Sequence, residues 1–195
     1  MSRLPAFAIA SALAAALVTG CSSPPAHFYT LSATAAPGSA QSKLAVAVGP
    51  VSVPATIDRP QIVVSTGANQ VSIDDFNRWA SPVQDELMRV VAENLVAILG
   101  TPRVTLYPTL ATDVDFRVQI EVRNFESAPG KQASLDAVWT VRRLKDGKSE
   151  TGRTSVRVPV QEGGYDALAA AHSRAVAQMS QEIADALRML DRAAP

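Results

Sequence analysis

Residues 115–160, DFRVQIEVRNFESAPGKQASLDAVWTVRRLKDGKSETGRTSVRVPV, decide the fold of this chain. Apolar and polar side chains alternate along three parts of this stretch, and the first run of apolar positions is Phe116, Val118, Ile120 and Val122. A repeat of two residues is typical of a β-strand that buries one face and exposes the other to water. Asp146-Gly147 is the residue pair that favours a tight hairpin turn. The pattern therefore predicts an antiparallel meander of three strands.

Two interruptions in the strand patterns predict local irregularities. Phe125 is one residue out of phase with the apolar run before it, which predicts a bulge near Arg123 or Asn124. Gly49-Pro50 breaks another alternating run. Because proline donates no backbone hydrogen bond, this break predicts a bulge or an edge strand.

Shorter strands are predicted upstream of the meander, at residues 28–31, 44–53, 61–65, 70–73 and 103–107. The segments 61–65 and 70–73 flank the turn residues TGAN and are expected to form a hairpin. Residues 33–42 are rich in Ala, Ser, Gly and Pro and are expected to be flexible. Pro159 predicts that the third meander strand lies at an edge or ends there.

Two amphipathic helices are also predicted. The first begins with Ser81 as the N-cap and Pro82 at the first helical position, and it ends before Gly100. The second follows Gly163-Gly164 and carries an apolar stripe among many alanines. Two helices with six to eight strands predict a single α+β (mixed α/β) domain, in which both helices pack on a largely antiparallel or mixed sheet.

The N-terminus predicts a lipid anchor. The apolar run at residues 6–18 is too short to span a bilayer, which takes about 20 residues, and is typical of a secretory signal. VTGC at residues 18–21 resembles the lipobox of bacterial lipoproteins, in which the Cys receives a diacylglycerol and, after cleavage before it, an N-acyl chain. The alternative is ordinary secretion with a buried or reactive Cys21. The expected organisation is a signal peptide at 1–20, a lipidated tether at 21–27 and one domain at 28–195.

The composition excludes several classes of protein. Because the chain has 18 basic and 18 acidic residues, it lacks the positive charge of a nucleic-acid binder. One Cys and two His cannot make an internal disulfide, a thiolate zinc site or a three-His metal site. His172 is expected at the margin of its helix's apolar stripe, and Asp74-Asp75 is interpreted as a turn before the first helix. We predict no enzymatic activity, no metal and no cofactor other than the covalent lipid on Cys21.

Three segments carry residue types that suit contact with a partner. Asp58 and Arg59 form a charged pair between two prolines on a short loop, a setting that suits docking. Trp79 either packs the entry of the first helix against the core or contacts a partner or lipid. In the third segment, residues 125–139, Trp139 lies in phase with buried positions and is expected in the core. The candidate partner-contact residues are Asp58, Arg59 and Trp79.

Phe28-Tyr29-Thr30-Leu31 behind the lipobox, followed by these segments in this order, resembles the paraquat-inducible protein C family of ABC-type transport auxiliary lipoproteins, formerly grouped as a domain of unknown function. The resemblance covers nearly all of the chain after Cys21. It implies partnership with a transport system that pairs an ABC permease or an integral membrane protein with a substrate-binding protein of the mammalian cell entry (MCE) type. It also implies a part in moving lipids between the inner and outer membranes, and it identifies no catalytic site.

The sequence therefore predicts a non-enzymatic lipoprotein of the outer membrane that faces the periplasm and docks an MCE-type conduit to that membrane. Ser22, rather than Asp, follows Cys21, which favours the outer over the inner membrane. Homo-oligomerisation is expected, because MCE proteins form rings. Two alternatives remain open: a carrier with a lipid cavity between the sheet and the helices, and an assembly lipoprotein for an outer-membrane export complex.

Overall fold

The computed structural model describes residues 24–39, 41–108, 113–161 and 163–193. The predicted signal peptide and Cys21 lie outside these ranges. The described elements, in chain order, are β1 (His27–Tyr29), β2 (Val46–Ser52), β3 (Gln61–Gly67), β4 (Gln70–Trp79), α2 (Val83–Leu99), β5 (Val104–Leu106), β6 (Phe116–Ala128), β7 (Gln132–Arg143), β8 (Ser149–Pro159) and α3 (Tyr165–Arg192). This order gives the predicted α+β domain, with two helices on one eight-stranded sheet.

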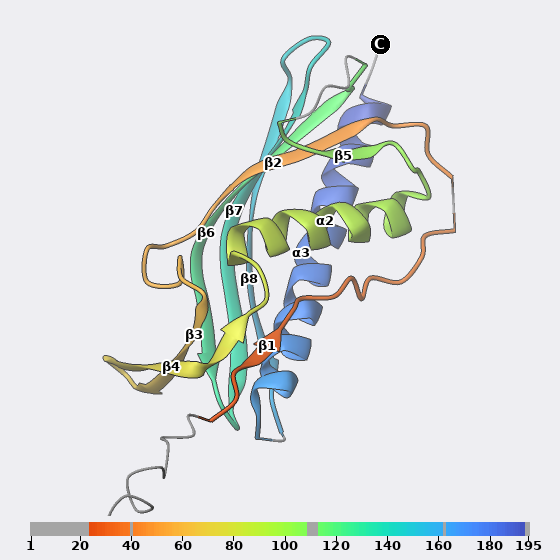
Figure 1. The fold of residues 1–195 in the computed structure, drawn as a ribbon. Coiled ribbons are helices and arrows are strands. Elements are labelled where there is room, and N and C mark those ends of the chain that lie inside the picture. The colour runs from red at the N-terminus through yellow and green to blue at the C-terminus, as the bar shows by residue number, and fades with distance from the viewer. Residues whose placement is uncertain (1–23, 40, 109–112, 162, 194–195) are drawn as a thin grey trace, which may run out of the picture.

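Strand β6 organises the sheet (Figure 1). On one side it pairs with β7 in an antiparallel ladder, and β7 pairs with β8 in the same way, which confirms the predicted meander. On its other side β6 has two neighbours. Its first half pairs in parallel with β2, and its far end touches β3 through the single pair Val64 and Ser127. The sheet is therefore mixed, with β2–β5 as one branch and β3–β4–β1 as the other.

The predicted irregularities are confirmed. The β6–β7 register shifts between Val122 and Asn124. The β2–β6 register shifts between Val48 and Val51, where Gly49 adopts a φ of 121° that favours glycine. Since β2 pairs with both β5 and β6, the Gly-Pro break is a bulge in an internal strand and not an edge. The strand β8 pairs only with β7 and ends at Pro159, as expected for an edge.

The predicted start of the first helix needs a correction. Helix α2 begins at Val83, and the N-cap position is held by Pro82, with no side-chain capping bond from Ser81. The carbonyl of Pro82, which has an extended ψ of 131°, instead accepts hydrogen bonds from the backbone amides of Asp85 and Glu86. The predicted C-terminus is confirmed, because Gly100 is left-handed with a φ of 64°.

Strand β4 is longer than the sequence indicated. The expected turn at Asp74-Asp75 is a bulge inside the strand, since Ile73 still pairs with Val63 and pairing resumes at Arg78 with Gln61. The carboxylate of Asp74 accepts hydrogen bonds from the backbone amides of Phe76 and Asn77 at 2.9 and 3.0 Å. These bonds replace the lost ladder bonds, so the strand continues to Trp79.

Both helices lie on the same side of the sheet, with α3 running along the meander and α2 against α3 and β2 (Figure 1). The residues of α3 that face the sheet are fully buried and include Ala175, Met179, Ile183 and Leu187. Side chains of both helices and of β6 and β7 join in one continuous core. Small alanines let α3 approach the sheet closely, so the packed interior fixes the positions of the surface loops.

The segment between β1 and β2 is irregular, as predicted, but it is held against the helices. The fully buried Asn94 of α2 accepts hydrogen bonds from the backbone amides of Thr34 and Ala35 at 3.1 and 3.0 Å. Its amide group donates to the hydroxyl of Ser180 on α3 at 3.3 Å. The expectation of a flexible stretch was therefore wrong at this point, because a buried amide fixes the backbone.

Candidate functional site

The three candidate partner-contact residues meet at one surface pocket of about 340 Å³. The loop after β2 supplies Asp58, Arg59 and Pro60, and the connection from β4 to α2 supplies Trp79 and the three residues after it. The backbone amide of Trp79 donates to the carbonyl of Pro60 at 2.7 Å, which ties the two segments together. We call this the Arg59 pocket.

Trp79 is mainly a core residue, the first of the two alternatives that the sequence left open. Its side chain is only 5% exposed. The indole lies 6.1 Å from the ring of Phe125 and 6.3 Å from that of His172, measured between ring centroids. The indole thus fixes the entry of α2 to the core, and Trp79 lines the Arg59 pocket together with Asp58 and Arg59.

Arg59 is the basic residue of the pocket, and its side chain is half-buried. Its Nε atom is buried and has no hydrogen-bond partner in the described part of the chain. A guanidinium group matches the two oxygens of a carboxylate. Arg59 therefore suits the binding of a hydrogen-bond acceptor at this pocket.

Glu86 lies close to this pocket and secures the chain that follows the tether. Its carboxylate accepts hydrogen bonds from the hydroxyl of Thr30 at 2.7 Å and the backbone amide of Leu31 at 3.0 Å. Arg89 pairs with the same carboxylate at 2.7 Å and donates to the carbonyl of Leu31 at 2.7 Å. Burial alone would raise the pKa of Glu86, but the bonds from Thr30, Arg89, Leu31 and Ser81 together lower it.

Sequence reasoning missed Glu86, although the signal was present. It sits three residues after Val83, in phase with the apolar stripe of the helix, where a carboxylate needs buried partners. Glu86 therefore holds the chain just after β1 against α2.

His172 is fully buried, and not at the margin of the stripe as predicted. Its ring stacks on Phe125 at 3.8 Å, and its Nε2 lies 2.8 Å from the hydroxyl of Ser127. Burial lowers the pKa of His172 to about 3, so the ring is neutral at physiological pH. His172 is buried because the bulge in β6 turns Phe125 inward over the face of α3 that carries this histidine. An imidazole without access to solvent cannot exchange protons with a substrate, which argues against a catalytic base here.

The carboxylate of Asp74 is also committed to structure. It accepts hydrogen bonds from the hydroxyl of Tyr165 at 2.7 Å and from the side-chain amide of Asn77 at 3.0 Å. The bond from Tyr165 is the main reason that the pKa of Asp74 is lowered. Tyr29 donates to Asn77 at 2.8 Å, so β1, β4 and α3 are linked at one corner of the fold.

Trp139 is buried as predicted and is 6% exposed. Its indole N–H donates to the hydroxyl of Thr154 at 3.0 Å, and its ring covers Gly152 on the neighbouring strand. Asp136, in the same segment, forms a two-bonded ion pair with Arg153 at 2.9 and 2.6 Å. This third segment therefore stabilises the meander.

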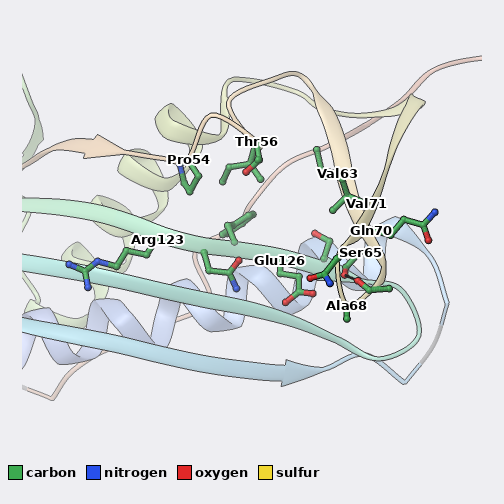
Figure 2. Close-up of a pocket in the computed structure, with 15 residues that line it drawn as sticks. Pro54, Thr56, Val63, Ser65, Ala68, Gln70, Val71, Arg123 and Glu126 are labelled. Carbon is green, nitrogen blue, oxygen red and sulfur yellow. Dashed lines mark hydrogen bonds between the residues drawn. The ribbon is translucent and has the colours of Figure 1, made fainter.

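A second hollow, which sequence reasoning missed, lies between the β3–β4 hairpin, the loop after β2 and the end of β6 (Figure 2). Its volume is about 330 Å³, and Figure 2 labels Ser65 and Gln70 of the hairpin and Glu126 of β6 among the residues that line it. It forms because β3 leaves β6 after the single pair Val64 and Ser127. No sequence pattern predicts where two strands diverge. Only the predicted bulge near Asn124 indicated an irregularity close to this hollow.

Two further properties concern the described residues only. Nowhere in them do three or more His, Cys, Asp or Glu side chains gather as they would around a metal ion. Neither of the two helices in the described ranges is long and apolar enough to cross a membrane.

Solved structures share this fold. A crystal structure of an uncharacterized protein is 21% identical, covers 83% of this chain and 98% of its own, and has a TM-score of 0.69. A Xanthomonas campestris protein matched by the family model DUF330 is 22% identical, covers 82% of this chain and 93% of its own, and also has a TM-score of 0.69. At these identities the likeness shows the fold alone. No curated protein matches the chain significantly.

The family model described as the ABC-type transport auxiliary lipoprotein component matches residues 29–184. The match runs from the end of β1 into α3 and includes Asp58, Arg59 and Trp79. The resemblance found in the sequence is thereby confirmed. The chain belongs to the family of ABC-type transport auxiliary lipoprotein components.

Proposed function

We propose that this protein is a non-enzymatic lipoprotein subunit that docks the periplasmic end of an MCE-type lipid conduit to the outer membrane. The observation that carries the proposal is the family match over residues 29–184, which begins eight residues after a lipobox ending at Cys21. The family match supports a place in an ABC-type transport system, and the lipobox supports attachment to a membrane.

The proposed anchor restricts the position of the body. A tether of residues 21–27 extends at most about 25 Å, at roughly 3.6 Å per residue. After it, Thr30 and Leu31 are fixed to Glu86 on α2. Two or three acyl chains hold such a protein at a membrane effectively permanently. The body would therefore stay at the membrane surface while presenting its loops to a partner.

The Arg59 pocket is the proposed contact with the partner. Arg59 and Trp79 both line it, and arginine and tryptophan are enriched among the residues that dominate binding energy. A carboxylate on the MCE-type partner fits the donor geometry of Arg59. Asp58, exposed beside it, offers the opposite charge to a basic residue on the same partner.

The titratable groups support a role without catalysis. Asp74, Glu86 and His172 have shifted pKa values, and each shift arises from burial or from hydrogen bonds that hold the fold together. A catalytic site would instead place such groups in an accessible cleft. The alternative of a lipid carrier has less support, because packed side chains fill the space between the helices and the sheet.

Reversing the charge at Arg59 tests the docking surface. The variant Arg59→Glu, made in the full chain, is compared with Arg157→Glu, which alters an exposed arginine on β8. We expect Arg59→Glu to weaken binding to the purified MCE-type partner by about tenfold or more, equivalent to about 1.4 kcal/mol, while Arg157→Glu binds as wild type. Equal binding by both variants would show that the Arg59 pocket is not the contact.

Light scattering of the same samples tests the expected homo-oligomer, which a monomer in the presence of the partner would contradict.

A further inference from the structure

The strands β1 and β4 expose four large apolar side chains to solvent. Phe28 is 64% exposed, Val71 61%, Ile73 45% and Phe76 41%. The described part of the chain has nine exposed large apolar side chains, so almost half of them lie on these two strands. We call these four residues the β1–β4 patch. Large apolar groups gathered in one place on a surface mark a contact with another molecule or with a membrane.

Three members of the patch share the outer face of the sheet. Phe28 pairs with Arg78, whereas their neighbours Tyr29 and Trp79 pair on the opposite, core-facing side. Ile73 pairs with Val63, between the buried residues Ile62 and Val64, so Ile73 and Val71 also face outward.

The outer face is held in place from behind. Tyr29 bonds to Asn77, and Tyr165 of α3 bonds to Asp74 in the bulge next to Phe76. The patch is therefore a fixed surface rather than a set of loose side chains, and little ordering is needed when it makes a contact.

We propose that the β1–β4 patch lies against the lipid surface to which the protein is anchored, and this rests on the proposed acylation of Cys21. Phe28 follows Cys21 by seven residues, so it stays within about 25 Å of the acylated residue in any conformation of the tether. The β3–β4 hairpin extends from the same end of the molecule as β1, while the β7–β8 turn and the C-terminus lie at the opposite end (Figure 1).

The composition of the patch suits the boundary between headgroups and acyl chains. Aromatic and aliphatic side chains insert there, and arginine remains at the level of the lipid phosphates. Arg78 lies beside Phe28 on the same face and is held by a bond from its Nε to the carbonyl of Asp75 at 2.8 Å. The contact orients the body, so that the Arg59 pocket is presented at a constant angle to its partner.

Site-directed tryptophans test this proposal in the full acylated chain. Phe28→Trp places a probe in the patch, and Leu144→Trp places the matched probe in the β7–β8 turn, where Leu144 is 42% exposed. Each variant is reconstituted in vesicles of phosphatidylethanolamine and phosphatidylglycerol that carry bromine at shallow acyl positions. Emission is corrected for Trp79 and Trp139 with the wild-type protein. Flotation of the same vesicles reports separately on the acyl anchor.

We expect brominated lipid to quench roughly half of the emission of the patch probe in Phe28→Trp, because interfacial side chains sit about 5–10 Å into the headgroup and acyl boundary. The turn probe in Leu144→Trp should be unaffected. Equal quenching of the two probes in vesicles that float with the protein would overturn the patch while leaving the anchor intact. Loss of flotation would overturn the anchor itself, and with it the patch. A patch probe that is shielded from iodide but not quenched by brominated lipid would show that protein covers the patch, and would also overturn the proposal.

Discussion

The buried histidine gives the sharpest test of the core. His172 is fully buried against Phe125, and the pKa of its ring is lowered to about 3 by burial, against an ordinary value of 6.5. The folded state therefore binds this proton more weakly than the unfolded state does. The stability that depends on the neutral ring is fully present above pH 6.5 and is lost as the pH falls toward 3.

The size of this effect follows from the two pKa values. Between them, each pH unit changes the free energy of unfolding by about 1.4 kcal/mol, so lowering the pH from 6.5 to 4.5 costs about 2 kcal/mol through this residue alone, since the unfolded ring is already half protonated at pH 6.5. His172→Gln removes the titrating group, while its amide can still bond to Ser127. The variant is expected to be about 1–2 kcal/mol less stable at pH 7, because it loses the stacked ring.

The assay is urea unfolding of residues 24–195, followed by the fluorescence of Trp79 and Trp139 at intervals from pH 4.5 to 7.5. Protonation of Asp74 and Glu86 also destabilises the fold in acid, because the pKa values of both carboxyl groups are lowered in the folded state. The test is therefore the difference in slope between wild type and His172→Gln, which should approach one proton. The exposed His27→Gln is the matched control and should keep the wild-type slope. Parallel pH curves for wild type and His172→Gln would show that the stability of the fold does not depend on keeping this ring neutral.

Three other variants test separate parts of the account. Gly152→Ala would place a methyl group against the indole ring of Trp139, closer than van der Waals contact allows. We therefore expect the free energy of unfolding in urea to fall by about 1–3 kcal/mol. Gly163→Ala, which meets no atom within 4 Å, should be neutral, and similar losses for both glycines would contradict the steric cause. Asn94→Leu leaves two backbone amides without their acceptor, and we expect a loss of about 2 kcal/mol or more and faster hydrogen exchange at both amides; unchanged exchange would show that the segment before β2 is held by other contacts. Cys21→Ala should abolish membrane fractionation and preserve the circular dichroism spectrum, whereas a membrane-bound variant would contradict the anchor.

Elements with strong periodicity could be predicted from the sequence. The meander, its bulge near Asn124 and the left-handed end of α2 at Gly100 follow from local patterns, since strand phase and helix termination are set within a few residues. The family could be identified as well, because its weak motifs occur in a fixed order behind the lipobox.

Features that depend on tertiary contacts were missed. The two-sided pairing of β6, which splits the sheet and opens the hollow under the β3–β4 hairpin, involves strands far apart in the sequence. Serine is a residue type that favours the N-cap position, yet Pro82, in an extended conformation, and not Ser81 occupies that position in the structure. Asp74-Asp75 looks like a turn because no local signal shows that Tyr165, about ninety residues later, holds a strand bulge together.

The candidate contact residues were only partly predictable. Their types suggested docking, but the sequence could not show that Asp58, Arg59 and Trp79 line one pocket, because the pairing of β3 with β4, extended by the bond from Trp79 to Pro60, brings their segments together. Nor could it show that Trp79 faces inward, since an aromatic residue before a helix suits either role.

We propose that this auxiliary lipoprotein serves an MCE-type lipid transport system from the outer membrane. The most direct measurement is purification of the full, acylated chain from cross-linked membranes of its own organism, with mass spectrometric identification of the proteins joined to residues around Arg59. We expect an MCE-domain protein, together with its inner-membrane permease, in the outer-membrane fraction that carries the chain. Cross-links to an outer-membrane β-barrel export protein, with no MCE-domain protein, would contradict it.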